Sequence, residues 1–255
     1  MYIEDPNPFM FQIGSFGVRW YGFLLASSMA VGVWYLLREV RRRGWDEDRI
    51  LTALLYSIIM GVVGARAIYV FTNWSTFAAD PSRIIRLDQG GLSWHGALIG
   101  GILTGWLLVR NQGINFGGAL DMTVPGWTLG YTLVRIANIL NQEVLGRHAE
   151  VLGTRHPAQL YGSAIGLILL IRYFVVQRRD TPDGYQFWSF ALWFSILRAV
   201  IEETFRANPL YAIGYISERW GAGLFTLTHL ITPPLLILTW YFLNRIWRDH
   251  RSGIR

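Results

Sequence analysis

Seven long apolar runs are the feature that most limits what this chain can fold into. They cover residues 18–37, 50–72, 91–109, 117–140, 158–176, 185–205 and 222–243. Each approaches or exceeds the ~20 residues that an α-helix needs to cross the hydrocarbon core of a bilayer. A soluble domain of 255 residues would have shorter apolar runs and more charge than the 16% found here. The sequence therefore predicts an all-α, polytopic membrane protein with about seven transmembrane helices.

The positive charge is distributed in a way that indicates an orientation. All 23 basic residues are arginines. Groups of them follow the first, third, fifth and seventh runs, at 38–49, at 110, at 172–179 and at 245–255. If every run crosses the membrane, these groups share one side, which is the positive-inside pattern. We therefore expect the N-terminus outside and the C-terminus in the cytoplasm. Because the arginines lie at run ends and not on one soluble face, we expect no nucleic acid to bind despite the net charge of +6.

The segments between the runs contain no repeat, low-complexity tract or linker that would separate two domains. We therefore expect one integral membrane domain over residues 1–255. The acidic start has no basic residue before the first run, so we expect that run to remain as a spanning helix and not to be a cleaved signal. Outer-face elaborations rich in turn-forming residues are expected near 1–17, 73–90, 141–157 and 206–221.

The chain has no cysteine, which excludes disulfides, cysteine metal ligands and a cysteine nucleophile. The histidines and carboxylates do not have the spacing of a metal site, and no glycine-rich phosphate loop of the nucleotide-binding kind is present. We therefore expect no metal and no cofactor. Any thiol chemistry would have to use the sulfur of a substrate.

Residues 133–150 begin inside an apolar run yet include an arginine, Arg135. An arginine in such a segment costs about 2.5–3.5 kcal/mol on insertion scales, and such residues usually line a cavity or an ion path. Residues three, four or seven apart share a helix face, so a polar stripe is expected from Tyr131, Arg135, Asn138 and Gln142. Arg135 has no acidic residue within four positions. Its charge must be offset by an anionic ligand or by Glu143, Glu202 or Asp121.

Two other runs also carry polar residues. Arg198 and Glu202 are four apart, so they can pair on a helix, and it stays open whether Arg198 only neutralises Glu202. His95 is followed by glycines that permit close helix contact or the approach of a ligand. On these local grounds it is either a packing residue or a proton acceptor.

With the N-terminus outside, these features and Tyr21 all lie at the depth of the outer leaflet. A guanidinium stays charged and can make two parallel hydrogen bonds to phosphate oxygens. Two arginines at that depth therefore suit the phosphate of a phospholipid head group, although a structural lipid site would have the same residues.

Four segments resemble the motifs of one enzyme family, in the family's order. They are His95-Gly96-Ala97-Leu98-Ile99-Gly100; Arg135-Ile-Ala-Asn138-Ile-Leu-Asn141-Gln-Glu143-Val-Leu-Gly146-Arg147; His156-Pro157-Ala158-Gln159-Leu160-Tyr161; and Arg198 with Glu202, followed by Phe205-Arg206. Together with Arg19-Trp20-Tyr21-Gly22, they extend the resemblance from residue 19 to about residue 234. The family is that of the phosphatidylglycerol–prolipoprotein diacylglyceryl transferases, and the second segment resembles its signature block.

The resemblance implies a seven-span enzyme of the bacterial cytoplasmic (inner) membrane. It would transfer the diacylglyceryl group of phosphatidylglycerol to the lipobox cysteine thiol of a prolipoprotein signal peptide. The products would be a thioether and glycerol phosphate, in the first step of lipoprotein maturation. It implies catalytic roles for His95, Arg135, Glu143, Arg198 and Glu202, and substrate-binding roles for Tyr21, Asn138, Asn141, Gly146 and Arg147.

The chain departs from the family pattern at several positions near these residues. Glycines of the family are replaced by Ala97, Val134, Ala137 and Gln142, and an expected glutamine is His229. These changes keep the charged residues but add side-chain volume beside them.

From these residues we expect Arg135 and Arg198 to hold the lipid phosphate and His95 to accept the thiol proton. Glu202 and Glu143 would orient the arginines or the histidine, and Asn138 and Tyr21 would supply neutral hydrogen bonds. Two alternatives stay open. A transporter also uses buried charges, although paired interrupted helices are not visible, and a non-catalytic lipid-binding protein would share the same arginines. The sequence assigns no role to Arg66.

Overall fold

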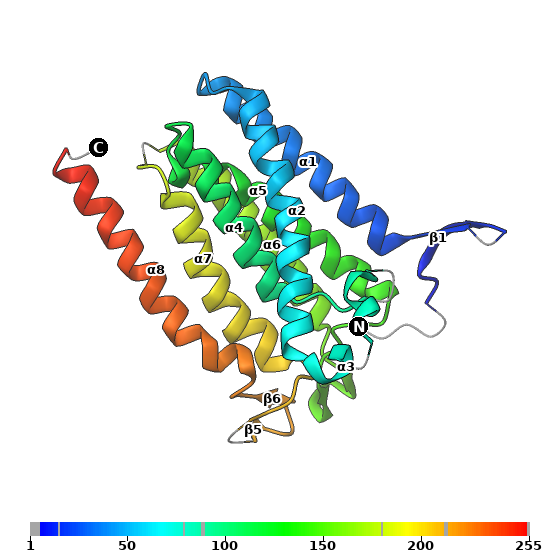
Figure 1. Cartoon of the computed structure of the whole chain (residues 1–255). Coiled ribbons are helices and arrows are strands. Elements are labelled where there is room, and N and C mark those ends of the chain that lie inside the picture. The colour runs from blue at the N-terminus through cyan, green and yellow to red at the C-terminus, as the bar shows by residue number, and fades with distance from the viewer. Residues whose placement is uncertain are drawn as a thin grey trace. The chain divides into compact units, whose positions relative to one another are not determined.

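The computed structural model describes residues 6–14, 16–78, 80–87, 90–179, 181–211 and 214–253, without the side chains of Phe16 and Trp94. Most of the described chain is helical (Figure 1). The helices are α1 (Trp20–Arg42), α2 (Glu47–Thr72), α3 (Trp74–Ala78), η1 (Pro81–Ile85), α4 (Trp94–Asn111), α5 (Phe116–Leu140), η2 (Glu150–Leu152), α6 (Ala158–Gln177), α7 (Tyr185–Leu197), the π-helix η3 (Arg198–Glu203) and α8 (Leu227–Arg251). The strands are β1 (Phe9–Ile13), β2 (Phe16–Arg19), β3 (His148–Ala149), β4 (Thr154–Arg155), β5 (Tyr215–Ser217) and β6 (Ala222–Gly223).

The all-α class predicted from the apolar runs is confirmed, because a helix lies at each of the seven runs. Of the helices in the described residues, α1, α2 and α6 are long and apolar enough to cross a membrane by length and composition. Seven crossings and the orientation of the termini stay predictions. The sequence did not indicate the antiparallel pairs β1–β2, β3–β4 and β5–β6, which lie at three of the expected outer elaborations.

The chain divides into two compact units. One comprises residues 37–119, and the other comprises residues 1–36 with residues 120–255. The single membrane domain expected over residues 1–255 stays a prediction.

Within residues 37–119, α2 and α4 pack closely through glycines. A Cβ added to Gly64 or Gly96 would overlap the backbone of the opposite helix, and one on Gly100 would overlap the carbonyl of Met60. Small residues allow helix axes to approach in this way. The sequence left open whether the glycines after His95 serve helix contact or a ligand, and here they serve helix contact.

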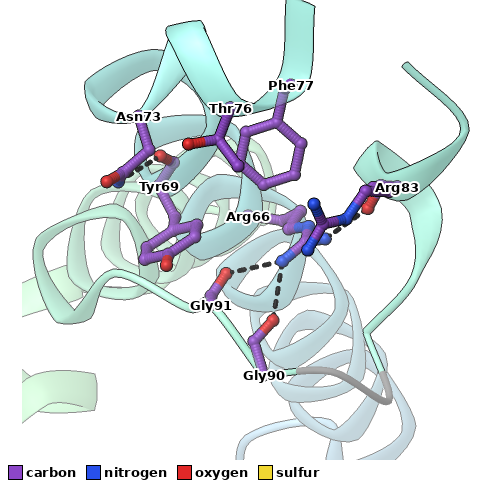
Figure 2. Close-up of a pocket in the computed structure, with 8 residues that line it drawn as sticks. All are labelled: Arg66, Tyr69, Asn73, Thr76, Phe77, Arg83, Gly90 and Gly91. Atoms are coloured by element: carbon purple, nitrogen blue, oxygen red, sulfur yellow. Dashed lines mark hydrogen bonds between the residues drawn. The ribbon is translucent and has the colours of Figure 1, made fainter. Parts of the chain in front are cut away.

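Arg66 binds backbone carbonyls of η1 and of described residues between η1 and α4. Its side chain is buried, and its guanidinium donates to five backbone carbonyls at 2.5–2.9 Å, those of Arg83, Ile84, Arg86, Gly90 and Gly91. Figure 2 shows the guanidinium between the glycine carbonyls and Arg83, with the ring of Phe77 beside it. A guanidinium has five N–H donors. Because all five are used on the backbone, Arg66 is a structural clamp.

The core of the other unit is aromatic and joins four helices. Tyr35 of α1, Val124 of α5 and Tyr173 of α6 are buried together, and Phe187 and Phe190 of α7 pack against them. The Tyr35 hydroxyl donates to that of Tyr173 at 3.3 Å, so the one polar atom of each ring is used inside the core. Figure 1 shows α8 running beside α7.

Asp121 and Pro125 lie within α5 and do not interrupt it. Asp121 is buried, and its carboxylate accepts hydrogen bonds from the backbone N–H groups of Gly184 at 2.8 Å and Phe187 at 2.7 Å. The first N–H groups of a helix have no partner inside the helix. Asp121 therefore caps α7 from a different helix, and this use accounts for its place in an apolar run.

Candidate active site

Helix α7 continues into η3, a π-helix over Arg198–Glu203. In a π-helix the hydrogen bonds join residues i and i+5, so side chains five positions apart share a face. Arg198 accordingly contacts Glu203, with 3.3 Å between Nη2 and Oε1. Arg198 and Glu202, whose spacing allowed a pair, form no ion pair in the described residues, because Glu202 binds Arg135 and Arg198 binds Glu203.

Glu202 instead holds Arg135. Its side chain is fully buried, and Oε1 lies 2.7 Å from Arg135 Nη2. The Tyr131 hydroxyl donates to the other carboxylate oxygen and accepts from Arg135 Nη2 at 3.0 Å. The guanidinium also lies over the Tyr131 ring, 4.6 Å from its centroid. Of the partners considered for Arg135, Glu202 is the carboxylate that offsets its charge.

Two further residues fix the position of Arg135. Asn138 is buried one turn along α5. With its amide oriented so that both atoms have partners, its oxygen accepts from Arg135 Nη1 at 3.2 Å. On α6, a Cβ added to Gly162 would lie 2.7 Å from Arg135 Nε. Only a glycine leaves room for the arginine there.

Glu203 is a second fully buried carboxylate, which the sequence reading missed. It pairs with Arg198 and also with Arg206, whose Nη1 lies 3.1 Å from Oε1. The adjacent acidic residues of the run, Glu202 and Glu203, were the available signal for it.

We call Arg135, Arg198, Glu202, Glu203 and Arg206 the arginine–glutamate cluster. Its three guanidinium groups meet two carboxylates, so it carries one excess positive charge. The Phe194 ring contacts both the Arg135 side and the Arg198 side of the cluster. It packs edge-on against Tyr131, with 4.9 Å between ring centroids, and its centroid lies 5.9 Å from Arg198 Cζ. Such a partly buried, net-positive cluster suits an anion.

The turn after α5 has an unusual backbone. Gln142 and Val144 have φ of 53° and 56°, in the left-handed region that favours glycine. This explains why the family that the sequence resembles has glycine where this chain has Gln142. The Glu143 side chain is exposed and makes no hydrogen bond or ion pair within the described residues, while its carbonyl accepts from Gln159 at 3.0 Å. Asn141, the first residue of this turn, is half-buried, and its Oδ1 has no hydrogen-bond partner in the described chain.

Gly146 and Arg147 pack against the third motif. A Cβ on Gly146 would overlap the carbonyl of His156, and the Arg147 carbonyl accepts from the His156 backbone N–H at 2.9 Å. The Arg147 guanidinium donates to the carbonyl of Asn208 at 2.7 Å, outside that motif. His156 lies 2.7 Å from the Trp220 carbonyl through Nε2 and 3.0 Å from the Tyr161 hydroxyl through Nδ1. Because a carbonyl only accepts, Nε2 carries the proton. These contacts give His156 a structural role.

His229 is the N3 residue of α8 in a capping box with Thr226. Its backbone N–H donates to the Thr226 hydroxyl at 3.4 Å, and its Nδ1 accepts from the Thr226 N–H at 3.3 Å. Glutamine commonly fills this position of a capping box. The histidine therefore substitutes for the expected glutamine without loss of the cap.

Tyr21 forms no hydrogen bond or ion pair with the cluster in the described residues, and His95 belongs to the other unit, residues 37–119. His95 is the second residue of α4 and its side chain is exposed. Tyr21 is the second residue of α1 and is half-buried. Their roles, and the common depth expected for all four polar features, stay predictions.

Comparison with known proteins gives consistent matches over the whole site. The family model described as "Prolipoprotein diacylglyceryl transferase" matches residues 8–245. The chain is 47% identical to a protein of Thermoanaerobacter sp. (strain X514) over 98% of this chain and 97% of the relative. It is 45% identical, over the same shares, to one of Caldanaerobacter subterraneus subsp. tengcongensis, and 35% identical to one of Thermus thermophilus over 95% of this chain and 99% of the relative. All three relatives carry the name phosphatidylglycerol–prolipoprotein diacylglyceryl transferase.

Proposed function

This chain belongs to the prolipoprotein diacylglyceryl transferase family, and on that premise we propose that it transfers the diacylglyceryl group of phosphatidylglycerol to a cysteine thiol of a prolipoprotein. The thiolate sulfur attacks the glyceryl carbon that is bonded to a phosphate oxygen. The carbon–oxygen bond breaks, a thioether forms, and glycerol phosphate leaves with the bonding electron pair. The thiol proton passes to a base.

The observation that carries this proposal is the excess positive charge of the arginine–glutamate cluster. Negative charge grows on the phosphate as the carbon–oxygen bond breaks. Guanidinium groups that are already in place stabilise this charge with little reorganisation, and they act most strongly where water is excluded. The Arg135 side chain is 10% exposed, and that of Arg198 is 31% exposed. In the proposal these two residues hold the phosphate.

The surrounding residues have supporting roles in the proposal. Glu202 orients Arg135, as their 2.7 Å ion pair supports. Asn138 and Asn141 offer hydrogen bonds to the head group, and the unpaired Oδ1 of Asn141 within the described chain supports this for Asn141.

Gly146 and Arg147 shape the outer segment where the acceptor peptide approaches, and Tyr21 adds a neutral hydrogen bond. The exposed Glu143 orients a cation or the base when substrate is bound. His95 is the proposed base, because imidazole accepts protons near neutral pH.

We also propose that all seven long helices cross the bacterial cytoplasmic (inner) membrane, with the N-terminus outside. The coincidence of helices with apolar runs and the arginines at alternate run ends support this topology. The chain then forms one multi-pass membrane domain. The acceptor is the lipobox cysteine at the outer face, where the signal peptide of a prolipoprotein is presented.

The test reconstitutes the protein in vesicles that contain phosphatidylglycerol, with a lipobox peptide outside. Mass spectrometry should detect a diacylglyceryl adduct on the cysteine peptide and none on the matched serine peptide. Arg135→Ala and Arg198→Ala should abolish the adduct, whereas Arg110→Ala, which removes an exposed arginine at the end of α4, should not. Solute flux without an adduct would favour a transporter. If neither an adduct nor flux is detected, a non-catalytic lipid-binding protein is the remaining alternative. Full activity of both alanine variants would refute the role of the cluster.

A further inference from the structure

We infer that Glu203 is a positioning residue, which holds Arg198 and Arg206 in place for the lipid phosphate; this inference rests on the proposed function. The two oxygens of its carboxylate have different partners. Oε1 accepts from Arg198 Nη2 at 3.3 Å and from Arg206 Nη1 at 3.1 Å. Oε2 accepts from Asn208 Nδ2 at 2.6 Å and from the Thr226 hydroxyl at 3.5 Å. The neutral donors of Asn208 and Thr226 fix the carboxylate through Oε2, and Oε1 orients the guanidinium groups of Arg198 and Arg206.

The π-turn is what brings Glu203 to Arg198. In an α-helix of 3.6 residues per turn, side chains five positions apart point about 140° away from each other. Over Arg198–Glu203 the helix is a π-helix, which returns residue i+5 to the face of residue i. Single π-turns are rare and occur frequently at functional sites. The local backbone therefore supplies the contact that the α-helical spacing would prevent.

The exposure of the three side chains indicates which of them meets a ligand. Glu203 is fully buried, whereas the side chains of Arg198 and Arg206 are 31% and 21% exposed. Arg198 Nε has no hydrogen-bond partner in the described residues. By contrast, Arg66 uses all five of its donors on backbone carbonyls. Arg198 thus retains N–H donors for a phosphate, while Glu203 fixes one edge of the guanidinium.

Glu203 also connects the cluster to the outer segment. Arg206 and Asn208 begin the stretch that leads to β5, and Thr226 caps α8 with His229. Glu203 Oε1 contacts both Arg198, at the start of η3, and Arg206, which follows η3. One carboxylate therefore fixes the end of this helix and the start of the outer stretch. Because its ionic partners are Arg198 and Arg206 at the proposed phosphate site, a change at Glu203 should affect the diacylglyceryl donor more than the peptide.

The experiment measures steady-state kinetics of transfer for Glu203→Gln and Glu203→Asp, with Glu218→Gln as the matched control. Glu218 is exposed in the same outer segment. Glutamine keeps the shape but removes the charge, so kcat or kcat/KM for phosphatidylglycerol should fall about 10- to 100-fold, as expected when a substrate-binding group is misplaced by less than about 1 Å. The KM for the lipobox peptide should stay near the wild-type value. The thermal unfolding midpoint, measured beside it, should fall, because two guanidinium groups lose their buried counter-charge. Glu203→Asp should restore part of the donor kinetics.

Unchanged donor kinetics in Glu203→Gln, beside an active wild type, would overturn the inference and leave the proposed function intact. An inactive wild type would refute the proposed function itself. If Glu203→Gln fails to fold, Glu203→Asp decides the matter. A donor-specific loss in the aspartate variant supports positioning, and wild-type donor kinetics would make Glu203 structural only.

Discussion

Gly162 leaves the space that Arg135 occupies, so Gly162→Ala should disable the enzyme without a change in any charged residue. The new Cβ would lie 2.7 Å from Nε, 2.8 Å from Cδ and 2.9 Å from Cγ of Arg135. Non-bonded heavy atoms are most favourable at about 3.5–4.0 Å, so the side chain has to retreat by about 1 Å. A shift of this size at a reacting centre can lower the rate about 100-fold, which corresponds to about 2.7 kcal/mol of transition-state stabilisation.

The assay compares initial rates of diacylglyceryl transfer to a lipobox peptide with the thermal unfolding midpoint of each variant. Alanine favours a helix over glycine by about 1 kcal/mol, which offsets part of an overpacking cost of about 1–3 kcal/mol. The midpoint should therefore change little while the rate falls. The matched control is Gly130→Ala in α5, whose Cβ would meet Ser28 Oγ at an ordinary 3.5 Å. Equal rates for the two variants would refute the argument that Gly162 sets the position of Arg135.

Three further substitutions test separate parts of the structure. Glu202→Gln leaves Arg135 without its buried counter-charge and should cost about 3–5 kcal/mol in unfolding free energy, together with activity; a fully stable variant in chemical unfolding would contradict the ion pair. Asp121→Ala removes the cap of α7 and should cost about 0.5–2 kcal/mol, and a loss smaller than that of an exposed aspartate control would count against the cap. Arg66→Ala releases the carbonyls of the segment before α4, so limited proteolysis there should accelerate; a cleavage rate equal to that of Arg83→Ala, which removes an exposed arginine nearby, would contradict the clamp.

The sequence predicted the helices well because an apolar run of about 20 residues has few alternatives to a helix. It also identified Arg135 and Glu202 as residues whose charges need compensation. Asp121 was considered as a counter-charge for Arg135, whereas its carboxylate accepts from backbone N–H groups of another helix. A contact between distant segments of this kind leaves no periodic signal.

The pairing inside the cluster could not be predicted, because it depends on one extra residue per turn. An α-helical spacing joins Arg198 to Glu202, whereas the π-helix joins Arg198 to Glu203 and leaves Glu202 to Arg135. A π-helical segment of six residues is too short to leave a hydrophobic periodicity of its own in the sequence. The sequence therefore identified Arg135, Arg198 and Glu202 but not Glu203, and the folded backbone decided which carboxylate pairs with which arginine.

The central claim is that the arginines hold a phosphate that leaves when sulfur attacks carbon. It is tested most directly with phosphatidylglycerol that carries a heavy oxygen isotope at the bridge between the diacylglyceryl carbon and phosphorus. Mass spectrometry then follows the label after transfer to a lipobox peptide. Cleavage between carbon and oxygen predicts that all of the label is in the released glycerol phosphate and none in the thioether-linked peptide. Label in the lipidated peptide or in free diacylglycerol would mean that a different bond breaks, and would contradict the account.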